Sequence, residues 1–148
     1  MKLGRIIAVA NQKGGVGKST TAINLSACLA EKGKNVLAID MDPQGNTTSG
    51  LGVDKNGIEN TLYELLLGEA ETKDTIVKDV VENLDLIPSN INLSGAEIEL
   101  VGIDDKEFIL KGITDKLRRK YDYIILDCPP SLNMLTINAL TAATSVLV

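Results

Sequence analysis

The sequence predicts an α/β fold in which a mostly parallel sheet is flanked by helices. Short apolar runs alternate with helical patterns along all 148 residues. The runs are continuous rather than alternating, which is typical of strands buried on both faces. Aromatic residues make up only 3% of the chain, so the core is expected to consist of Ile, Leu, Val and Ala. We expect residues 1–148 to form one domain with right-handed crossovers.

The elements can be placed in order. Apolar runs predict strands over 6–10, 36–39, 84–87, 123–126 and from 145 onward. Helical spacing predicts helices over 19–32, ended by Gly33, and over 133–142. The stretch 46–57 is predicted to be a loop. Capping-box spacing predicts further helix starts at Thr61 with Glu64, Ser94 with Glu97, and Asp104 with Glu107.

A glycine-rich turn joins the first strand to the first helix. It reads Lys13-Gly14-Gly15-Val16-Gly17-Lys18-Ser19-Thr20. Glycines let backbone N–H groups approach phosphate oxygens closely, Lys18 can reach the β and γ phosphates, and the Ser19 hydroxyl can bind Mg²⁺. Gln12 stands where the usual motif has its first glycine, and the additional Lys13 follows it. We therefore predict that residues 14–20 bind the phosphates of a nucleotide.

Acidic residues follow two other predicted strands. Asp40 and Asp42 come after the run 36–39, and Asp127 comes after 123–126. Ligands of open parallel sheets bind beyond the carboxyl ends of the strands, so these side chains are expected at the edge where the glycine-rich turn lies. Ser19, Asp40 and Asp127 are the candidate Mg²⁺ ligands. Asp40 or Asp42 could orient water for in-line attack on a phosphoryl group.

Composition excludes several kinds of site. The chain has no histidine, which removes His-dependent acid–base catalysis and most zinc sites. Cys28 and Cys128 are far apart, as expected in a reducing cytoplasm, and both are predicted to be small buried residues.

The net charge of −5 divides into +3 over residues 1–49 and −8 over the remainder, so positive charge surrounds the predicted phosphate loop. No signal sequence or long apolar run is visible, which predicts a cytoplasmic protein. The final apolar run stops without a cap, which suggests a truncated chain.

Three ordered segments resemble those of one family, the ParA/MinD ATPases. Residues 13–19 are similar to its deviant Walker A box, a variant of the P-loop of nucleotide triphosphatases. Residues 40–48 resemble the Walker A′ segment of the ParA/Soj branch, and residues 125–131 its Walker B and switch region. The resemblance covers essentially the whole chain. It identifies the sequence as an N-terminal portion of a ParA/Soj-type ATPase.

The resemblance implies a role for each residue. Lys13 would reach across a dimer to the partner subunit's ATP, and Lys18 would bind ATP in its own subunit. Ser19 would ligate Mg²⁺, Asp127 would hold it through water, and Asp42 would polarise the attacking water. A lysine that a monomeric site does not need implies a second subunit.

The resemblance also implies a biological role. Such proteins are ATP-dependent dimer switches that hydrolyse ATP, bind DNA non-specifically and respond to a ParB-like centromere-binding partner during chromosome or plasmid partition. DNA binding would use segments beyond residue 148 and would place the protein at the nucleoid. An isolated fragment is expected to have weak or no ATPase activity.

Three alternatives stay open at this point. A MinD-like ATPase would position the division site at a membrane, although Asp42-Pro43-Gln44-Gly45-Asn46 counts against that branch and no membrane association is expected. An iron–sulfur carrier of the same superfamily would use cysteines at a dimer face. The chain could also be an inactive truncated remnant.

Overall fold

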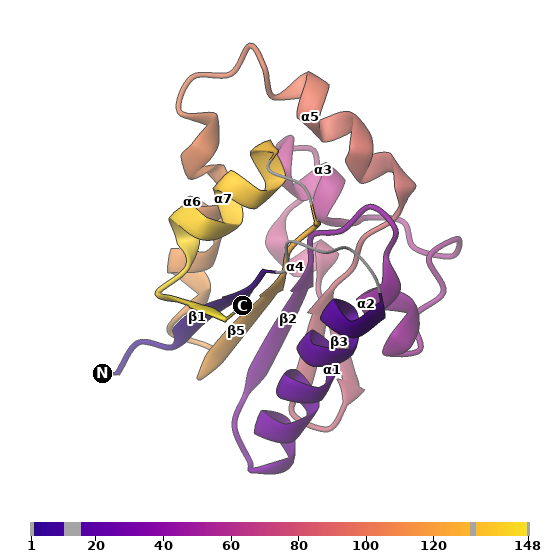
Figure 1. The fold of residues 1–148 in the computed structure, drawn as a ribbon, viewed down its shortest axis with the longest axis vertical. Helices are drawn as coiled ribbons and strands as arrows, with labels where there is room; N and C mark the ends of the chain where they lie inside the picture. The colour runs from indigo at the N-terminus through magenta and orange to yellow at the C-terminus, as the bar shows by residue number, and fades with distance from the viewer. Residues whose placement is uncertain (1, 11–15, 131–132, 148) are drawn as a thin grey trace.

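The fold is built on one twisted, six-stranded sheet with strand order β3-β4-β2-β5-β1-β6 (Figure 1). A computed structural model describes residues 2–10, 16–130 and 133–147, with side chains from residue 21 onward in the helix that begins at residue 16. Among these residues only β3 runs antiparallel, against β4. The strands are β1 (Arg5–Val9), β2 (Val36–Asp40), β3 (Val77–Val81), β4 (Leu84–Ile87), β5 (Tyr123–Asp127) and β6 (Ser145–Leu147).

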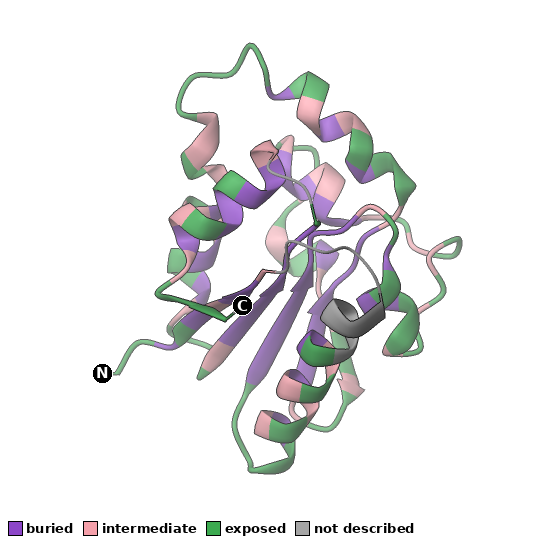
Figure 2. Ribbon diagram, viewed as in Figure 1, coloured by how far each residue is buried: buried purple, intermediate pink, exposed green. Residues whose placement is uncertain are grey.

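Helices cover both faces of the sheet. The long helix α1 (Val16–Glu31) packs on one face, next to the short helix α2 (Asn46–Gly50). On the other face lie α3 (Leu62–Leu66), α5 (Ala96–Glu99), α6 (Ile109–Leu117) and α7 (Met134–Ala142). The short elements α4 (Thr72–Thr75), η1 (Ile91–Gly95) and η2 (Lys106–Phe108) complete the connections. The central strands are buried between the two helical layers, as Figure 2 shows.

The predicted fold class is confirmed, and so are most of its elements. The five predicted strands are present to within one residue at the ends that the structure describes. Gly33, with φ +85°, follows the end of α1. Thr61 and Glu64 form the expected capping box: the Glu64 carboxylate accepts from the Thr61 N–H at 2.7 Å, and the Thr61 hydroxyl accepts from Tyr63 N.

Two of the predicted helix starts are wrong. The helical stretch around Ser94 begins earlier, after Asn90, whose side chain accepts from the Asn92 N–H. Ser94 lies inside that stretch, and its hydroxyl donates to the Ile91 carbonyl instead. Near Asp104, the N-cap position of η2 is occupied by Asp105 instead. Asp105 has a left-handed backbone conformation, and its side chain makes no capping hydrogen bond.

Three further expectations need correction. Residues 46–50 form α2 instead of a loop, and the edge strand β3 was not predicted. β3 could not be predicted from the sequence, because its side chains are at least partly exposed and its pairing with β4 is irregular. Cys128 is buried as expected, but Cys28 is exposed. The inward face of α1 follows Ala22, Ser26 and Ala30, and Cys28 lies on the opposite side of the helix.

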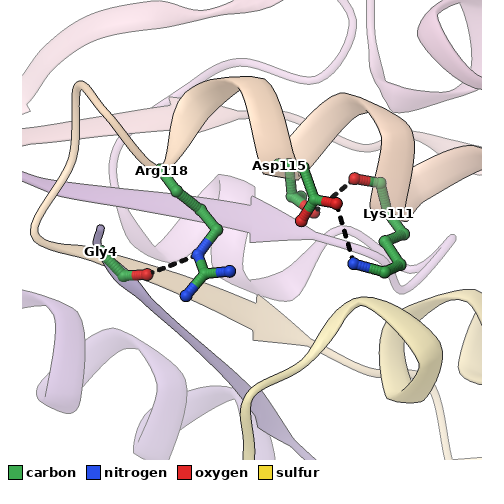
Figure 3. A network of polar contacts seen from close by, with 5 residues as sticks. Gly4, Lys111, Asp115 and Arg118 are labelled. Carbon is green, nitrogen blue, oxygen red and sulfur yellow. Dashed lines mark hydrogen bonds and ion pairs between the residues drawn. The ribbon is translucent and has the colours of Figure 1, made fainter. Parts of the chain in front are cut away.

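The start of the chain is held by the end of α6. The Arg118 Nε donates to the Gly4 carbonyl at 2.7 Å, and the Gly4 N–H donates to the Arg118 carbonyl at 2.8 Å (Figure 3). The Lys111–Asp115 ion pair lies one turn earlier on α6. An added Cβ at Gly4 would stand 2.0 Å from the Tyr121 carbonyl oxygen, far inside contact distance. Only glycine fits here, because the obstacle is backbone.

Changing Gly4 to alanine is therefore expected to destabilise the protein by about 1–3 kcal/mol, the usual range for overpacking. Gly112 provides the matched control, because it lies within α6 and a Cβ there would meet nothing within 4 Å. Gly112→Ala should stabilise by about 0.5–1 kcal/mol through helix propensity. Urea unfolding of both variants measures the difference. Equal stability of the two variants would contradict the close approach at Gly4.

Candidate functional site

Two predicted site residues, Asp40 and Asp127, lie side by side at the carboxyl edge of the sheet. They are direct register partners on β2 and β5, and Asp127 also pairs with Val9 at the end of β1. Side chains alternate along a strand, and Ala38 and Ile125, two residues earlier, pack in the cluster beneath α1. Both carboxylates therefore point to the face that α1 covers. Both are buried, with Asp127 1% exposed and Asp40 fully enclosed.

Two threonines of α2 hold these carboxylates. The Thr47 hydroxyl donates to Asp127 Oδ2 at 2.6 Å, and the Thr48 hydroxyl donates to Asp40 Oδ2 at 2.6 Å. The backbone N–H of Thr48 also donates to Asp40 Oδ2 at 2.9 Å. Asp40 Oδ1 accepts from the Asp42 N–H at 3.1 Å. The segment after β2 thus folds back and places one hydroxyl on each aspartate.

The electrostatic state of Asp40 differs from that of an ordinary carboxylate. The pKa of Asp40 is raised from 3.8 to about 6, chiefly by burial; the Thr48 hydrogen bonds lower it in part, and the nearby charge of Asp127 raises it. A buried carboxylate loses hydration of its charged form, which is the dominant cause here. Through the hydrogen bonds that it accepts, Asp40 holds the loop after β2 in place, and it is also a candidate Mg²⁺ ligand.

Asp42 lies two residues after the end of β2 and is also buried, with 7% of its surface exposed. Its Oδ1 accepts from Gln44 N at 3.0 Å, and its carbonyl oxygen accepts from Gly45 N at 2.8 Å and from the Ser89 hydroxyl at 2.7 Å. Ser89 is fully buried at the end of β4, and its N–H donates to the Thr48 hydroxyl at 3.0 Å. Sequence reasoning missed Ser89, Thr47 and Thr48 as supports of the site. Their hydroxyl side chains in the connections that follow β2 and β4, at the edge where the predicted site lies, are the signal that could have indicated them.

The predicted phosphate loop joins β1 to α1 at the same edge. β1 ends at Val9, whose carbonyl accepts from the Cys128 N–H at 3.1 Å, and α1 begins at Val16. The end of β1 thus lies beside Asp127, and α1 begins after a connection of six residues; the N–H groups at the start of a helix favour an anion. Lys13, Gly14 and Gly15 lie outside the described residues. Val16, Gly17, Lys18, Ser19 and Thr20 form the first turn of α1, and their side chains are likewise outside the description.

Comparisons with known proteins identify the family. The AAA domain family matches residues 4–148. The chain belongs to this family. It is 56% identical over 146 residues to the sporulation initiation inhibitor protein Soj of Bacillus subtilis, covering 99% of this chain and 58% of that protein. It is 51% identical to the chromosome partitioning protein ParA of Myxococcus xanthus, covering 99% of this chain and 52% of that protein.

A solved structure shows the same fold as this AAA domain. Cobyrinic acid a,c-diamide synthase from Mycobacterium smegmatis, with bound ATP analogue and magnesium, superposes with a TM-score of 0.92 at 45% identity. The match covers 97% of this chain and 59% of that one. The resemblance to ParA/Soj-type ATPases predicted from the motifs is confirmed, and the chain spans little more than half the length of these relatives.

The donor set of this AAA domain suits Mg²⁺ held together with a nucleotide. Among the described residues no group of three or more acidic, cysteine or histidine side chains is arranged to hold a metal by itself. Mg²⁺ is usually bound through one or two carboxylates plus substrate phosphates and water, and Asp127 is the carboxylate beside the phosphate-loop end of β1. Asp40 uses both oxygens on backbone and Thr48 donors. Its assignment as a ligand stays a prediction, as do those of Ser19 and Asp127.

Within the described part of this AAA domain, no helix is long and apolar enough to cross a membrane.

Proposed function

We propose that the protein binds and hydrolyses Mg·ATP in the cytoplasm and uses the ATP-bound dimer as a switch in chromosome or plasmid partition. One observation carries the proposal: Asp40, Asp42 and Asp127 meet at the sheet edge where β1 leads into α1. The names of the Soj and ParA relatives and the ATP analogue and magnesium of the superposed structure support it.

The residues would divide the chemistry as follows. Residues 14–20 would bind the phosphates through the start of α1, with Lys18 on the β and γ phosphates. Ser19 and Asp127 would hold Mg²⁺, which neutralises charge on the phosphates. Asp42 would orient the attacking water, since its backbone is fixed by Ser89 and Gly45. Lys13 would reach the nucleotide of a partner subunit and link ATP binding to dimerisation.

The expected partners follow from the same proposal. A second copy of the chain would complete the site through its Lys13. A ParB-like centromere-binding protein would stimulate hydrolysis, and DNA would be bound non-specifically through segments outside residues 1–148. The protein would then concentrate on the nucleoid while ATP is bound.

Two lysine variants of the full-length protein test this proposal together. Lys18→Ala should weaken ATP binding about 10- to 100-fold, the worth of a charge-assisted contact to phosphate. Lys13→Ala should bind ATP like the wild type in the monomer but fail to dimerise with it. Titration with a fluorescent ATP analogue and sedimentation velocity measure the two effects.

Lys32→Ala is the matched control, because Lys32 is exposed beyond the far end of α1. It should change neither ATP binding nor dimerisation. Wild-type affinity in Lys18→Ala would overturn the phosphate-loop assignment. If Lys13→Ala still formed dimers with ATP, the proposed role of Lys13 at the partner subunit's nucleotide would be rejected.

A further inference from the structure

The chain after α2 returns to the connection between β2 and α2, residues 41–45, which is named the Asp42 loop. Lys55 lies in a turn closed by a backbone bond at 3.1 Å, from the Gly57 N–H to the Asp54 carbonyl. The Lys55 Nζ donates to the Gln44 carbonyl at 2.7 Å. None of the ion pairs among the described residues includes Lys55. Its ammonium group is thus directed at the backbone of the Asp42 loop rather than at a carboxylate.

The alkyl stem of Lys55 covers Gly45. Gly45 is buried and has a left-handed backbone with φ +66°. A Cβ added to it would stand 2.5 Å from Lys55 Cδ and 3.2 Å from the Ser89 carbonyl oxygen. Gly45 therefore lies close to both the lysine stem and the segment after β4, and a larger residue in its place would displace the stem.

The peptide unit between Gln44 and Gly45 links Lys55 to Asp42. Its C=O accepts from Lys55, and its N–H, which belongs to Gly45, donates to the Asp42 carbonyl at 2.8 Å. The Gln44 N–H donates to Asp42 Oδ1 at 3.0 Å. Hydrogen bonds in such a chain polarise one another, and a charged donor makes a stronger bond than a neutral one. Lys55 is therefore joined to the backbone groups that hold the carbonyl and the carboxylate of Asp42.

The direction of the Asp42 carboxylate is decisive in the proposed reaction. Phosphoryl transfer needs an attacking oxygen in line with the bond that breaks, and a misplacement of about 1 Å can lower the rate about 10²-fold. Gln44 is exposed, so water would bind its carbonyl if the lysine were absent. Water would satisfy this carbonyl but would not fix its position.

We propose that Lys55 is a positioning residue for ATP hydrolysis, which holds the peptide unit 44–45 so that the Asp42 carboxylate is directed at the attacking water. In this role Lys55 acts through the backbone of the Asp42 loop and not on the nucleotide. The proposal rests on the proposed function, because it concerns ATP hydrolysis.

Substitutions of Lys55 in the full-length protein test the proposal by single-turnover hydrolysis and ATP binding. Lys55→Met keeps an apolar stem over Gly45 and removes the donor. It should lower the hydrolysis rate about tenfold and leave ATP affinity within about twofold of the wild type. Lys55→Arg keeps a charged donor and should restore most of the rate. Lys34→Met is the matched control, because Lys34 is exposed before β2, at the opposite end of that strand, and should behave like the wild type.

A double variant separates positioning from a general effect on the fold. Lys55→Met should slow hydrolysis about tenfold when Asp42 is present and not at all in the Asp42→Ala background, because Lys55 acts through the Asp42 carboxylate. A merely structural role would slow both backgrounds by the same factor.

The contact between Lys55 and the Asp42 loop has a readout that needs no nucleotide. In Lys55→Met the Gly45 amide should exchange with solvent about tenfold faster than in the wild type, as measured by NMR on the nucleotide-free protein. The Leu62 amide, which donates to the Pro88 carbonyl at 2.9 Å, is the control and should exchange at the wild-type rate. An unchanged rate at Gly45 would show that Lys55 does not hold the loop.

Further results would overturn the positioning role. These are wild-type hydrolysis in Lys55→Met, a loss in Lys55→Arg as large as in Lys55→Met, and equal losses with and without the Asp42 carboxylate. Weakened ATP binding in Lys55→Met that accounts for the slower hydrolysis would assign Lys55 to the binding step, against the proposal. Absence of ATP hydrolysis in the wild type would contradict the proposed function, while the exchange of the Gly45 amide would still decide whether Lys55 holds the loop.

Discussion

Replacing Asp42 with alanine is expected to leave ATP binding intact and to lower ATP turnover about 10²- to 10⁴-fold, the usual loss when a general base is removed. The structure makes this variant informative, because the backbone of Asp42 is fixed independently of its carboxylate. Its carbonyl accepts from Ser89 and Gly45, whereas the side chain accepts from Gln44 N. Removing the carboxylate should therefore spare the loop. The ATP-bound dimer should accumulate.

Single-turnover hydrolysis and sedimentation with ATP measure these two effects. Asp54→Ala is the matched control: Asp54 is exposed, lies in the connection that follows α2 and also accepts from a backbone N–H two residues ahead. It should hydrolyse ATP at the wild-type rate. Normal turnover in Asp42→Ala would reject its role in orienting water, and loss of ATP binding would show that Asp42 serves the binding step instead.

Replacing Asp40 with asparagine is expected to change how stability depends on pH. Folding raises the pKa of Asp40 from 3.8 to about 6, so the folded state binds the proton more tightly than the unfolded state. The stabilisation that Asp40 provides is therefore complete below about pH 4 and is lost as the pH rises to about 6. Each unit of pKa corresponds to about 1.4 kcal/mol, so the loss is about 3 kcal/mol.

Asp40→Asn lacks this loss, so its stability relative to the wild type should improve by about 3 kcal/mol between pH 4 and pH 7. A constant penalty is expected at all pH values, because the amide nitrogen would face the Thr48 N–H that now donates to Oδ2. Urea unfolding without nucleotide or Mg²⁺ measures the difference. Asp74→Asn, at an exposed aspartate, is the control: it shows how losing a surface carboxylate alone changes the pH dependence of stability. A stability difference between Asp40→Asn and the wild type that does not vary with pH would contradict the burial that raises the pKa of Asp40.

The elements that sequence reasoning predicted correctly carry their signals locally. The four central strands are continuous apolar runs because both faces are covered by helices, and the Thr61–Glu64 capping box needs only four neighbouring residues. The elements it missed depend on distant partners. β3 exists through pairing with β4, and α2 is held by hydrogen bonds from Thr47 to Asp127 and from Thr48 to Asp40. Ser94 has the right spacing for a helix cap. However, the helical turn already begins after Asn90, so Ser94 lies inside it and its hydroxyl donates to the Ile91 carbonyl.

The glycine-rich turn with its additional lysine, the aspartates after two apolar runs and the alternation of elements are properties of the sequence alone. They predicted the fold class and the family, and they named the candidate residues. Only the tertiary structure decided that Asp40 and Asp127 are register partners, that Thr47, Thr48 and Ser89 fix them and their loop, and that Lys55 reaches the Gln44 carbonyl. The physical reason is that a strand's apolar pattern records its burial, whereas strand order and hydrogen bonds between distant residues depend on how the whole chain packs.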